Sequence, residues 1–224
     1  MTRLAVGLAV LVFALGAALW WFGLGSARAP QAAGGVELSP PKVMTSGGIG
    51  LRYSESEYAI ATSPAHITVS SFIPPCDEGF DYCIYDKGSA YGGTTFESAG
   101  LRVKERKDLT TESSCLKSPP TGYADLAPTL RYAGDGFTTT VFYPLEGAAT
   151  GHSSKAALYR LSFEKTCYEF ETRVGRSNVD NYEKGTVKAF TEGEMQNAFA
   201  GLREILEASS IGANKRIIFP TVRY

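Results

Sequence analysis

His66 and His152 are the only imidazoles in the chain, and they are the first residues to consider for chemistry. His152 lies in the loop-like stretch GHSSK, where it could act as a general base toward a serine or pair with a carboxylate brought from elsewhere in the fold. Residues adjacent in sequence rarely point at one another, and no G-x-S-x-G elbow is present. We therefore expect His152 to be a loop residue with a binding role, and an envelope hydrolase is the alternative.

The chain offers few ligands for a metal ion. A zinc site needs three or four ligands, and two isolated histidines without a C-x-x-C pair do not supply them. Asp77, Glu78 and Asp81 lie in one acidic stretch that could present oxygen atoms to calcium, but their spacing does not fit the calcium-loop pattern. We interpret this stretch as a solvated turn, and the sequence predicts no metal site and no cofactor.

A basic strand is the best candidate for ligand binding. Arg102, Lys104 and Arg106 alternate with Leu101 and Val103, so the three cations share one face of a predicted strand. This face could bind an anionic polymer such as a surface polysaccharide. The alternative is that the charges only prevent edge-to-edge aggregation. The chain has 22 Lys and Arg against 23 Asp and Glu, and this balance, without interleaved aromatics, argues against a nucleic-acid partner.

Two carboxylates on a later strand have the spacing of a possible acid pair. Glu169 and Glu171 alternate with Tyr168 and Phe170, so both point to the same face. A glycosidase needs two carboxyl groups about 5 to 9.5 Å apart, one of them with a raised pKa. A strand with one solvated face shows the same alternation. We therefore expect Glu169 and Glu171 to lie on a solvent-exposed face.

The N-terminal segment determines the compartment. Leu4–Leu24 is an unbroken apolar run of about the roughly 20 residues that cross a bilayer as a helix, with Trp20 and Trp21 near its end. Small-x-small patterns between residues 25 and 29 also suit a signal peptidase. We expect export, with the domain either secreted or periplasmic, or anchored to the membrane by a single pass.

Export changes the interpretation of the four cysteines, because disulfides persist in oxidising compartments. Four cysteines allow three connectivities. Cys76 and Cys83 flank a short loop, so we favour Cys76–Cys83 together with Cys115–Cys167. A rigid Asp77–Tyr82 loop also suggests a second alternative function, that of a peptidase inhibitor.

The hydrophobic pattern predicts an α+β domain, in which an antiparallel sheet of short strands is covered on one face by a late amphipathic helix. ALYRLSF and TCYEFETRV should form a hairpin, and Thr191 with Glu194 makes a capping box before an apolar stripe. Short strands are also predicted at 67–69, at 186–190 and at 137–143, the last ended by Pro144. The order of elements, with a late helix reading I-L-x-x-S at 205–209, is similar to that of Mog1/PsbP-like domains, a resemblance that implies a fold and no function.

The sequence as a whole predicts four parts: a signal or transmembrane anchor segment (1–25), a flexible Ala/Gly/Pro-rich linker (26–48), a single extracytoplasmic α+β domain (49–210) and a C-terminal tail (211–224). The function we expect is non-catalytic binding in the cell envelope, through His152 or through Arg102, Lys104 and Arg106. Its partners would be the membrane, contacted by the N-terminal apolar segment, and an envelope protein or anionic polymer.

Overall fold

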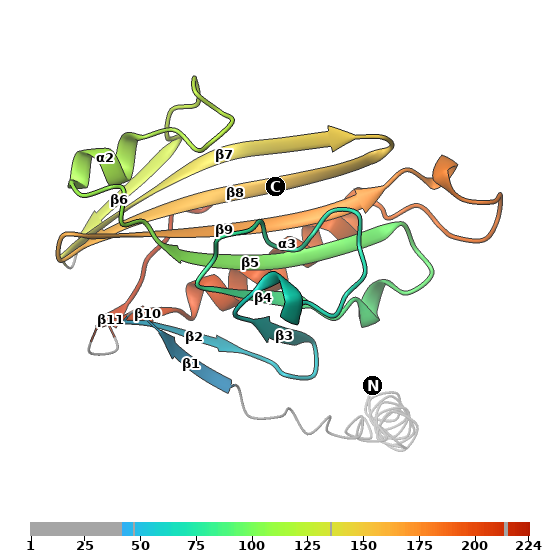
Figure 1. Ribbon diagram of the computed structural model, residues 1–224, viewed down its shortest axis with the longest axis horizontal. Coiled ribbons are helices and arrows are strands. Elements are labelled where there is room, and N and C mark those ends of the chain that lie inside the picture. Colours follow the sequence, from blue (N-terminus) through green and yellow to red (C-terminus); the bar gives the residue numbers. More distant parts are fainter. Residues whose placement is uncertain (1–41, 47, 135, 213–214) are drawn as a thin grey trace, which may run out of the picture. The chain divides into compact units, whose positions relative to one another are not determined.

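The computed structural model of the protein describes residues 42–46, 48–134, 136–212 and 215–224 (Figure 1). These residues form mostly antiparallel sheets and one long helix, which confirms the α+β prediction in its general form. The larger sheet has seven strands in the order β3-β4-β5-β9-β8-β7-β6. Their bounds are β3 Tyr58–Ala61, β4 Tyr82–Asp86, β5 Phe96–Glu105, β6 Leu130–Gly134, β7 Phe137–Ala149, β8 His152–Phe163 and β9 Thr166–Ser177.

The hairpin of β8 and β9 is the centre of this sheet, and it confirms the hairpin prediction. Phe163 pairs with Thr166 at its closed end. Between them Glu164 and Lys165 both have positive φ, at 47° and 69°, the left-handed conformation that a tight two-residue turn requires. Both strands are 12 residues long, and β7 has 13, so the central strands are longer than the short strands that were predicted.

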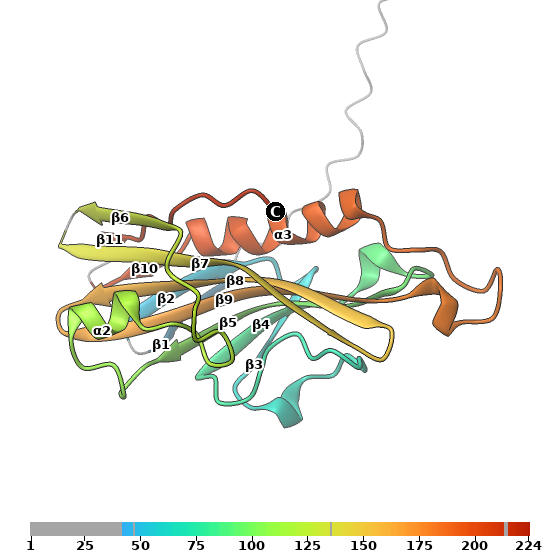
Figure 2. The ribbon, with the colours of Figure 1, turned by 90° about the horizontal axis from the view of Figure 1, so that it is seen from above.

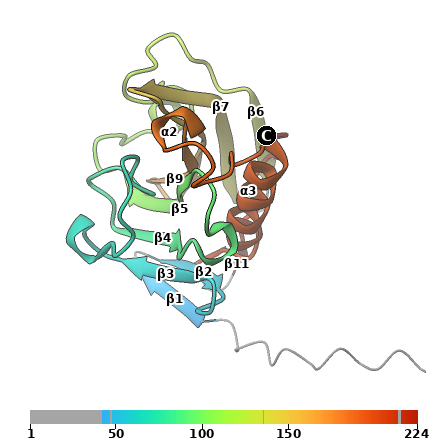
Figure 3. The ribbon, with the colours of Figure 1, turned by 90° about the vertical axis from the view of Figure 1, so that its right-hand side faces the viewer.

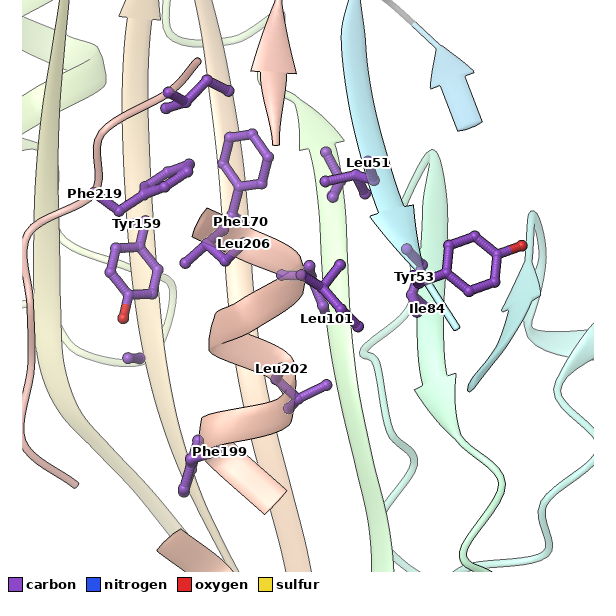
Figure 4. Packing of buried hydrophobic residues seen from close by; sticks show 14 of the residues in the cluster. Leu51, Tyr53, Ile84, Leu101, Tyr159, Phe170, Phe199, Leu202, Leu206 and Phe219 are labelled. Atoms are coloured by element: carbon purple, nitrogen blue, oxygen red, sulfur yellow. The ribbon is translucent and has the colours of Figure 1, made fainter. Parts of the chain in front are cut away.

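The long helix α3 (Glu192–Glu207) covers one face of the sheet, as Figure 2 shows. Thr191 and Glu194 form the predicted capping box, in which each side chain bonds to the backbone N–H of the other residue. The apolar stripe of α3 is buried in the main core together with alternate residues of the strands, and Figure 4 shows Leu202 and Leu206 among Leu101 and Phe170. We call this side of the sheet the inner face and the opposite side the outer face.

A second, smaller sheet completes the core beside α3. It has the order β1-β2-β10-β11, with bounds β1 Lys42–Ser46, β2 Ile49–Tyr53, β10 Ser210–Ile211 and β11 Lys215–Arg216. Ile49 and Leu51 of β2 belong to the main core. The last residue, Tyr224, also closes this core, because its ring stacks on Phe199 at 3.9 Å and its hydroxyl hydrogen-bonds to that of Tyr159.

Both disulfides have the favoured connectivity. Cys76 is bonded to Cys83, seven residues apart, and Cys115 to Cys167, 52 residues apart. Cys115 lies on the short helix α2 (Glu112–Lys117), which Thr111 caps. Two disulfides are typical of a protein in an oxidising, extracytoplasmic compartment.

Three strand predictions need correction. Residues 67–69 are not a strand; they follow a 3₁₀ turn at Pro64–His66, and the N–H of Thr68 bonds to the side-chain hydroxyl of Tyr85 in place of a strand partner. Residues 186–190 make only a single bridge, between Thr94 and Lys188. Pro144 does not end β7, because a register shift between residues 142 and 145 lets the strand continue past it.

Candidate functional site

The loop between β3 and β4 (residues 62–81, the β3–β4 loop) lies across part of the outer face, on the side away from α3 (Figure 3). The loop comes so close to the sheet that a side chain at two strand positions, both glycine, would clash with it. A Cβ atom at Gly100 would lie 2.5 Å from the carbonyl oxygen of Pro75, and one at Gly175 would lie 2.9 Å from the side chain of Ile73. The Oγ of Ser98 donates to the carbonyl of Ile73 over 2.6 Å. The Cys76–Cys83 disulfide ties the end of this loop to β4.

A second segment covers the outer face over β7 and β8. It consists of α2 and the residues up to 128, and we call it the α2 segment. The Cys115–Cys167 disulfide joins it to β9, and Thr140 of β7 donates to the carbonyl oxygen of Leu116. Farther along, Tyr123 packs against a small cluster of buried apolar residues on the same face. Each cover is thus held to the sheet by its own disulfide.

A cavity of about 410 Å³ lies on the outer face between these two covers. This volume is in the range of small-molecule sites. The cavity is lined by Asp77 and Glu78 of the β3–β4 loop, by Asp108, Pro120, Thr121 and Tyr123, and by strand residues Arg102, Lys104, Arg106, Leu145, Ser154, Ala156, Leu158, Glu169, Glu171 and Arg173. Nine of these sixteen residues are charged. We call it the charged cavity.

Glu169 is the centre of the ion pairs that floor the charged cavity. Its Oε1 accepts a hydrogen bond from Arg102 Nη2 at 2.6 Å, and its Oε2 accepts one from Arg106 Nη1 at 2.6 Å. The Nε of Arg160, whose side chain is 1 % exposed, lies 2.6 Å from the same Oε2. Three guanidinium groups therefore meet one carboxylate that is 3 % exposed.

Glu171 and Asp77 extend the network toward the β3–β4 loop. Glu171 accepts from Arg102 Nη2 at 2.7 Å, and its other oxygen lies 2.6 Å from Arg173 Nη2. Arg173 in turn makes a two-pronged contact with Asp77. The charged residues of three strands and one loop are thus joined into one continuous set of contacts.

This geometry corrects one prediction. Glu169 and Glu171 do not lie on a solvent-exposed face, because they are only 3 % and 4 % exposed. Arg102, at 9 % exposed, pairs with both of them. The reason is that β5 and β9 are neighbours, with Arg102 opposite Glu171. Burial of either sign alone would be costly, and each strand supplies the counter-charges of the other.

The arginines also shift the pKa values of the outer acids. Hydrogen bonds from Arg106 lower the pKa of Asp108 to about 2. Burial by itself would raise the pKa of Asp77, but the hydrogen bonds and the charge of Arg173 outweigh this effect and leave it lowered. Both carboxylates are therefore held in their ionised form against Arg106 and Arg173.

Lys104 differs from the other cations of the cavity. It is half-buried, and within the described residues its ammonium has no ion pair and no hydrogen bond. Its Nζ lies under the disulfide loop, 3.2 Å from where a Cβ of Gly79 would be. Of the three cations predicted on the basic strand, the structure brings all three to one cavity and leaves only Lys104 without a counter-ion.

His152 is not part of the charged cavity. Its Nδ1 contacts Glu97 Oε1, and its ring stacks on Phe72 with 4.0 Å between centroids. His152 lines a separate pocket of about 560 Å³ near the β7–β8 turn, together with Ser153 and Ser177. Ser177 is engaged by the Tyr182 hydroxyl at 2.8 Å, and in the described ranges no serine hydroxyl bonds to His152.

Sequence reasoning missed several residues of these sites, among them Glu97, Phe72, Asp108, Arg160 and Arg173. A signal existed for the arginines. Arg160 shares a face of its strand with Ala156, and Arg173 shares a face of the partner strand with Glu169 and Glu171. Opposite charges on the same face of predicted hairpin partners are a warning that the face is paired. No such signal marks Glu97 or Phe72.

Neither a cluster of metal ligands nor a membrane-spanning helix is found in the described part of the chain. There, no group of three or more His, Cys, Asp and Glu side chains has an arrangement that could hold a metal ion. No helix among the same residues is long and apolar enough to cross a membrane. Leu4–Leu24, on which the predictions of export and of an anchor depend, lies outside the described residues.

Comparison with known proteins assigns no family to the chain. No protein-family model matches it, and no curated protein is significantly similar to it. The resemblance to Mog1/PsbP-like domains therefore stays an expectation from the sequence.

Proposed function

We propose that this protein is an exported, non-catalytic binding domain of the cell envelope whose ligand site is the charged cavity. The observation that carries the proposal is the construction of that cavity. Its floor is a network of ion pairs on the rigid central strands, and its two walls are each held by a disulfide. Rigid walls around a preformed volume favour binding, because little conformational entropy is lost when a ligand enters.

A binding role is favoured over acid–base catalysis by the state of the carboxylates. Both oxygens of Glu169 and both oxygens of Glu171 already contact guanidinium groups at 2.6 to 2.7 Å. A general acid or base must reach the substrate proton within hydrogen-bond distance. These oxygens are occupied by arginines, so the pair is better suited to hold the floor of the site than to act on a substrate.

The disulfides and the N-terminal segment support the proposal that the domain is exported. Two bridges suit an exported domain, and Leu4–Leu24 has the composition of a membrane anchor or signal segment. The partners we propose are the membrane, through that segment, and an envelope protein or anionic polymer, through the charged cavity.

The hydrolase alternative has one specific observation in its favour, the contact of His152 Nδ1 with Glu97, since a carboxylate on one ring nitrogen can orient a histidine base. Among the described residues, however, no nucleophile is hydrogen-bonded to the other ring nitrogen. The inhibitor alternative is disfavoured because Phe80 and Tyr82 of the disulfide loop are buried and Asp77 is held by Arg173. Such a loop presents little side chain to a protease.

Blocking the cavity tests the proposal. Thr121 is exposed and lines the cavity, so Thr121→Trp should fill its mouth without disturbing the ion pairs. Thr110 is exposed and does not line it, so Thr110→Trp is the matched control. Amide chemical shifts of the oxidised protein would be followed during titration with trigalacturonate, inorganic phosphate and neutral maltotriose. We expect at least one probe to shift cavity amides, and Thr121→Trp alone to abolish the effect. Absence of binding, or binding that Thr121→Trp leaves intact, would refute the proposal.

A further inference from the structure

We infer that the charged cavity recognises an oxyanion, a carboxylate or a phosphate group, and that Lys104 Nζ is the contact which binds it. This rests on the proposed function and adds the chemical class of the ligand. The inference follows from a count of charges, from unmatched donors and from the position of Lys104.

The ion-pair network is neutral without Lys104. It contains the arginines 102, 106, 160 and 173 and the carboxylates 77, 108, 169 and 171. Four positive charges meet four negative charges, and every member has at least one partner. Lys104 is the fifth cation on this floor, and it has no counter-ion among the described residues. The floor therefore carries one uncompensated positive charge.

Glu78 is the remaining charged residue of the lining, and it does not neutralise Lys104. Its side chain is exposed on the rim of the disulfide loop, and it makes no ion pair within the described residues. A charge on the rim is screened by solvent and salt, whereas a half-buried ammonium inside the cavity is screened much less. An anion that enters the cavity would find in Lys104 a positive charge that no described carboxylate pairs with.

Several buried donors of the network have no hydrogen-bond partner among the described residues. They are the Nε atoms of Arg102, Arg160 and Arg173 and the Nη2 of Arg160, although Arg160 Nε lies within ion-pair distance of Glu169. Arg102 is 9 % exposed and lines the cavity, as does Arg173. A buried donor without an acceptor is unfavourable, because its hydrogen bond to water is lost and not replaced. Among the side-chain atoms of the network that lack a hydrogen bond in the described structure, four are arginine nitrogens and one is a carboxylate oxygen, Glu171 Oε1, so donors outnumber acceptors beneath the cavity.

The walls suit a group carried on a larger molecule. Thr121 and Ser154 line the cavity and offer hydroxyl groups, and Tyr123 offers a ring. An acidic sugar residue has the hydroxyls to use such partners, and a phosphate group uses the charge alone. The two sources share the oxyanion and differ in the affinity that the walls would add.

The test compares Lys104→Gln with Lys107→Gln in the full, oxidised protein. Lys107 is exposed, near the end of the same strand, and does not line the cavity. The probes are trigalacturonate and inorganic phosphate, with maltotriose as the neutral control. The amide of Gly79, beside Lys104 Nζ, reports binding by its chemical shift. We expect Lys104→Gln to weaken anion binding about tenfold, Lys107→Gln to leave it unchanged, and Lys104→Arg to retain most of it.

The outcomes distinguish a failure of the inference about Lys104 from a failure of the proposed binding function of the cavity. If trigalacturonate binds more tightly than phosphate, the ligand is an acidic saccharide; equal affinities indicate recognition of the oxyanion alone. If Thr121→Trp abolishes binding but Lys104→Gln does not weaken it, the inference is wrong and the proposed function stands. If neither variant has an effect, both are wrong. Unchanged thermal unfolding of Lys104→Gln would show that a loss of binding is not a loss of folding.

Discussion

Arg102 of β5 lies directly opposite Glu171 of β9, and its Nη2 donates to that carboxylate over 2.7 Å while also reaching Glu169 over 2.6 Å. One guanidinium thus bridges two carboxylates that are adjacent on the same face of one strand. This relationship makes Arg102, on a strand that is basic in sequence, part of a buried network of ion pairs. Lys104 lies on the same strand face and has no ion pair among the described residues.

Removal of the central carboxylate should destabilise the fold strongly. Glu169→Gln leaves Arg102, Arg106 and Arg160 without their shared counter-ion in a buried place, and loss of one partner of a buried pair costs about 3–5 kcal/mol. Urea unfolding would measure the change. Glu112→Gln is the control, since Glu112 pairs with Arg131 at 3.5 Å on the surface and should change stability by less than about 1 kcal/mol. Similar effects of the two substitutions would contradict the role assigned to Glu169.

Gly100 should not tolerate a methyl group. In Gly100→Ala the new Cβ would lie 2.5 Å from the Pro75 carbonyl oxygen, so the β3–β4 loop must move away, at a cost of about 1–3 kcal/mol. Gly92→Ala is the matched control, because nothing lies within 4 Å of a Cβ there. Thermal unfolding would compare the two. Equal stability of both variants would show that the loop does not pack on the sheet at Gly100.

The two disulfides should differ in their contribution to stability. In the chain-entropy model the stabilisation grows with the length of the loop that a disulfide closes. The two cysteines are 7 residues apart in Cys76–Cys83 and 52 residues apart in Cys115–Cys167. Loss of Cys115–Cys167, by substitution of both cysteines with alanine, should cost about 4 kcal/mol, and loss of Cys76–Cys83 about 2 kcal/mol. Chemical unfolding of the two double variants would measure this order. A reversed order would mean that the short bridge does more than restrict the unfolded chain.

Acid should weaken the fold through Asp77 and Asp108. Their folded pKa values are lowered from 3.8, that of Asp108 to about 2, so their contribution to stability is present above pH 4 and is lost as the pH falls toward 2. We expect the double variant Asp77→Asn with Asp108→Asn to be less stable at pH 7 and to lose less stability between pH 4 and pH 2. Thermal midpoints across this range would measure the difference. Asp125→Asn, at an exposed position without an ion pair in the described chain, should follow the wild-type curve.

Short-range patterns in the sequence predicted part of this structure correctly. The Thr191–Glu194 capping box, the apolar stripe of α3 and the β8–β9 hairpin depend on neighbours a few residues apart, and each has its own spacing. The disulfide connectivity followed from loop length and an even number of cysteines. The strand predicted at 67–69 failed because two alternating apolar residues can also belong to a loop that packs on a sheet.

The sequence by itself determined the residues that carry charge, and it predicted the α+β class and the disulfide pairing that the structure confirms. Only the tertiary structure decided which charges meet. Arg102 and Glu171 are 69 residues apart, and their pairing depends on β5 and β9 being neighbours in a particular register. A shift by one residue would put every side chain of a strand on the opposite face. Local spacing tells which residues share a face, but the order of strands in the sheet decides the partners of that face. This order placed Lys104 beside a network of ion pairs that is neutral without it.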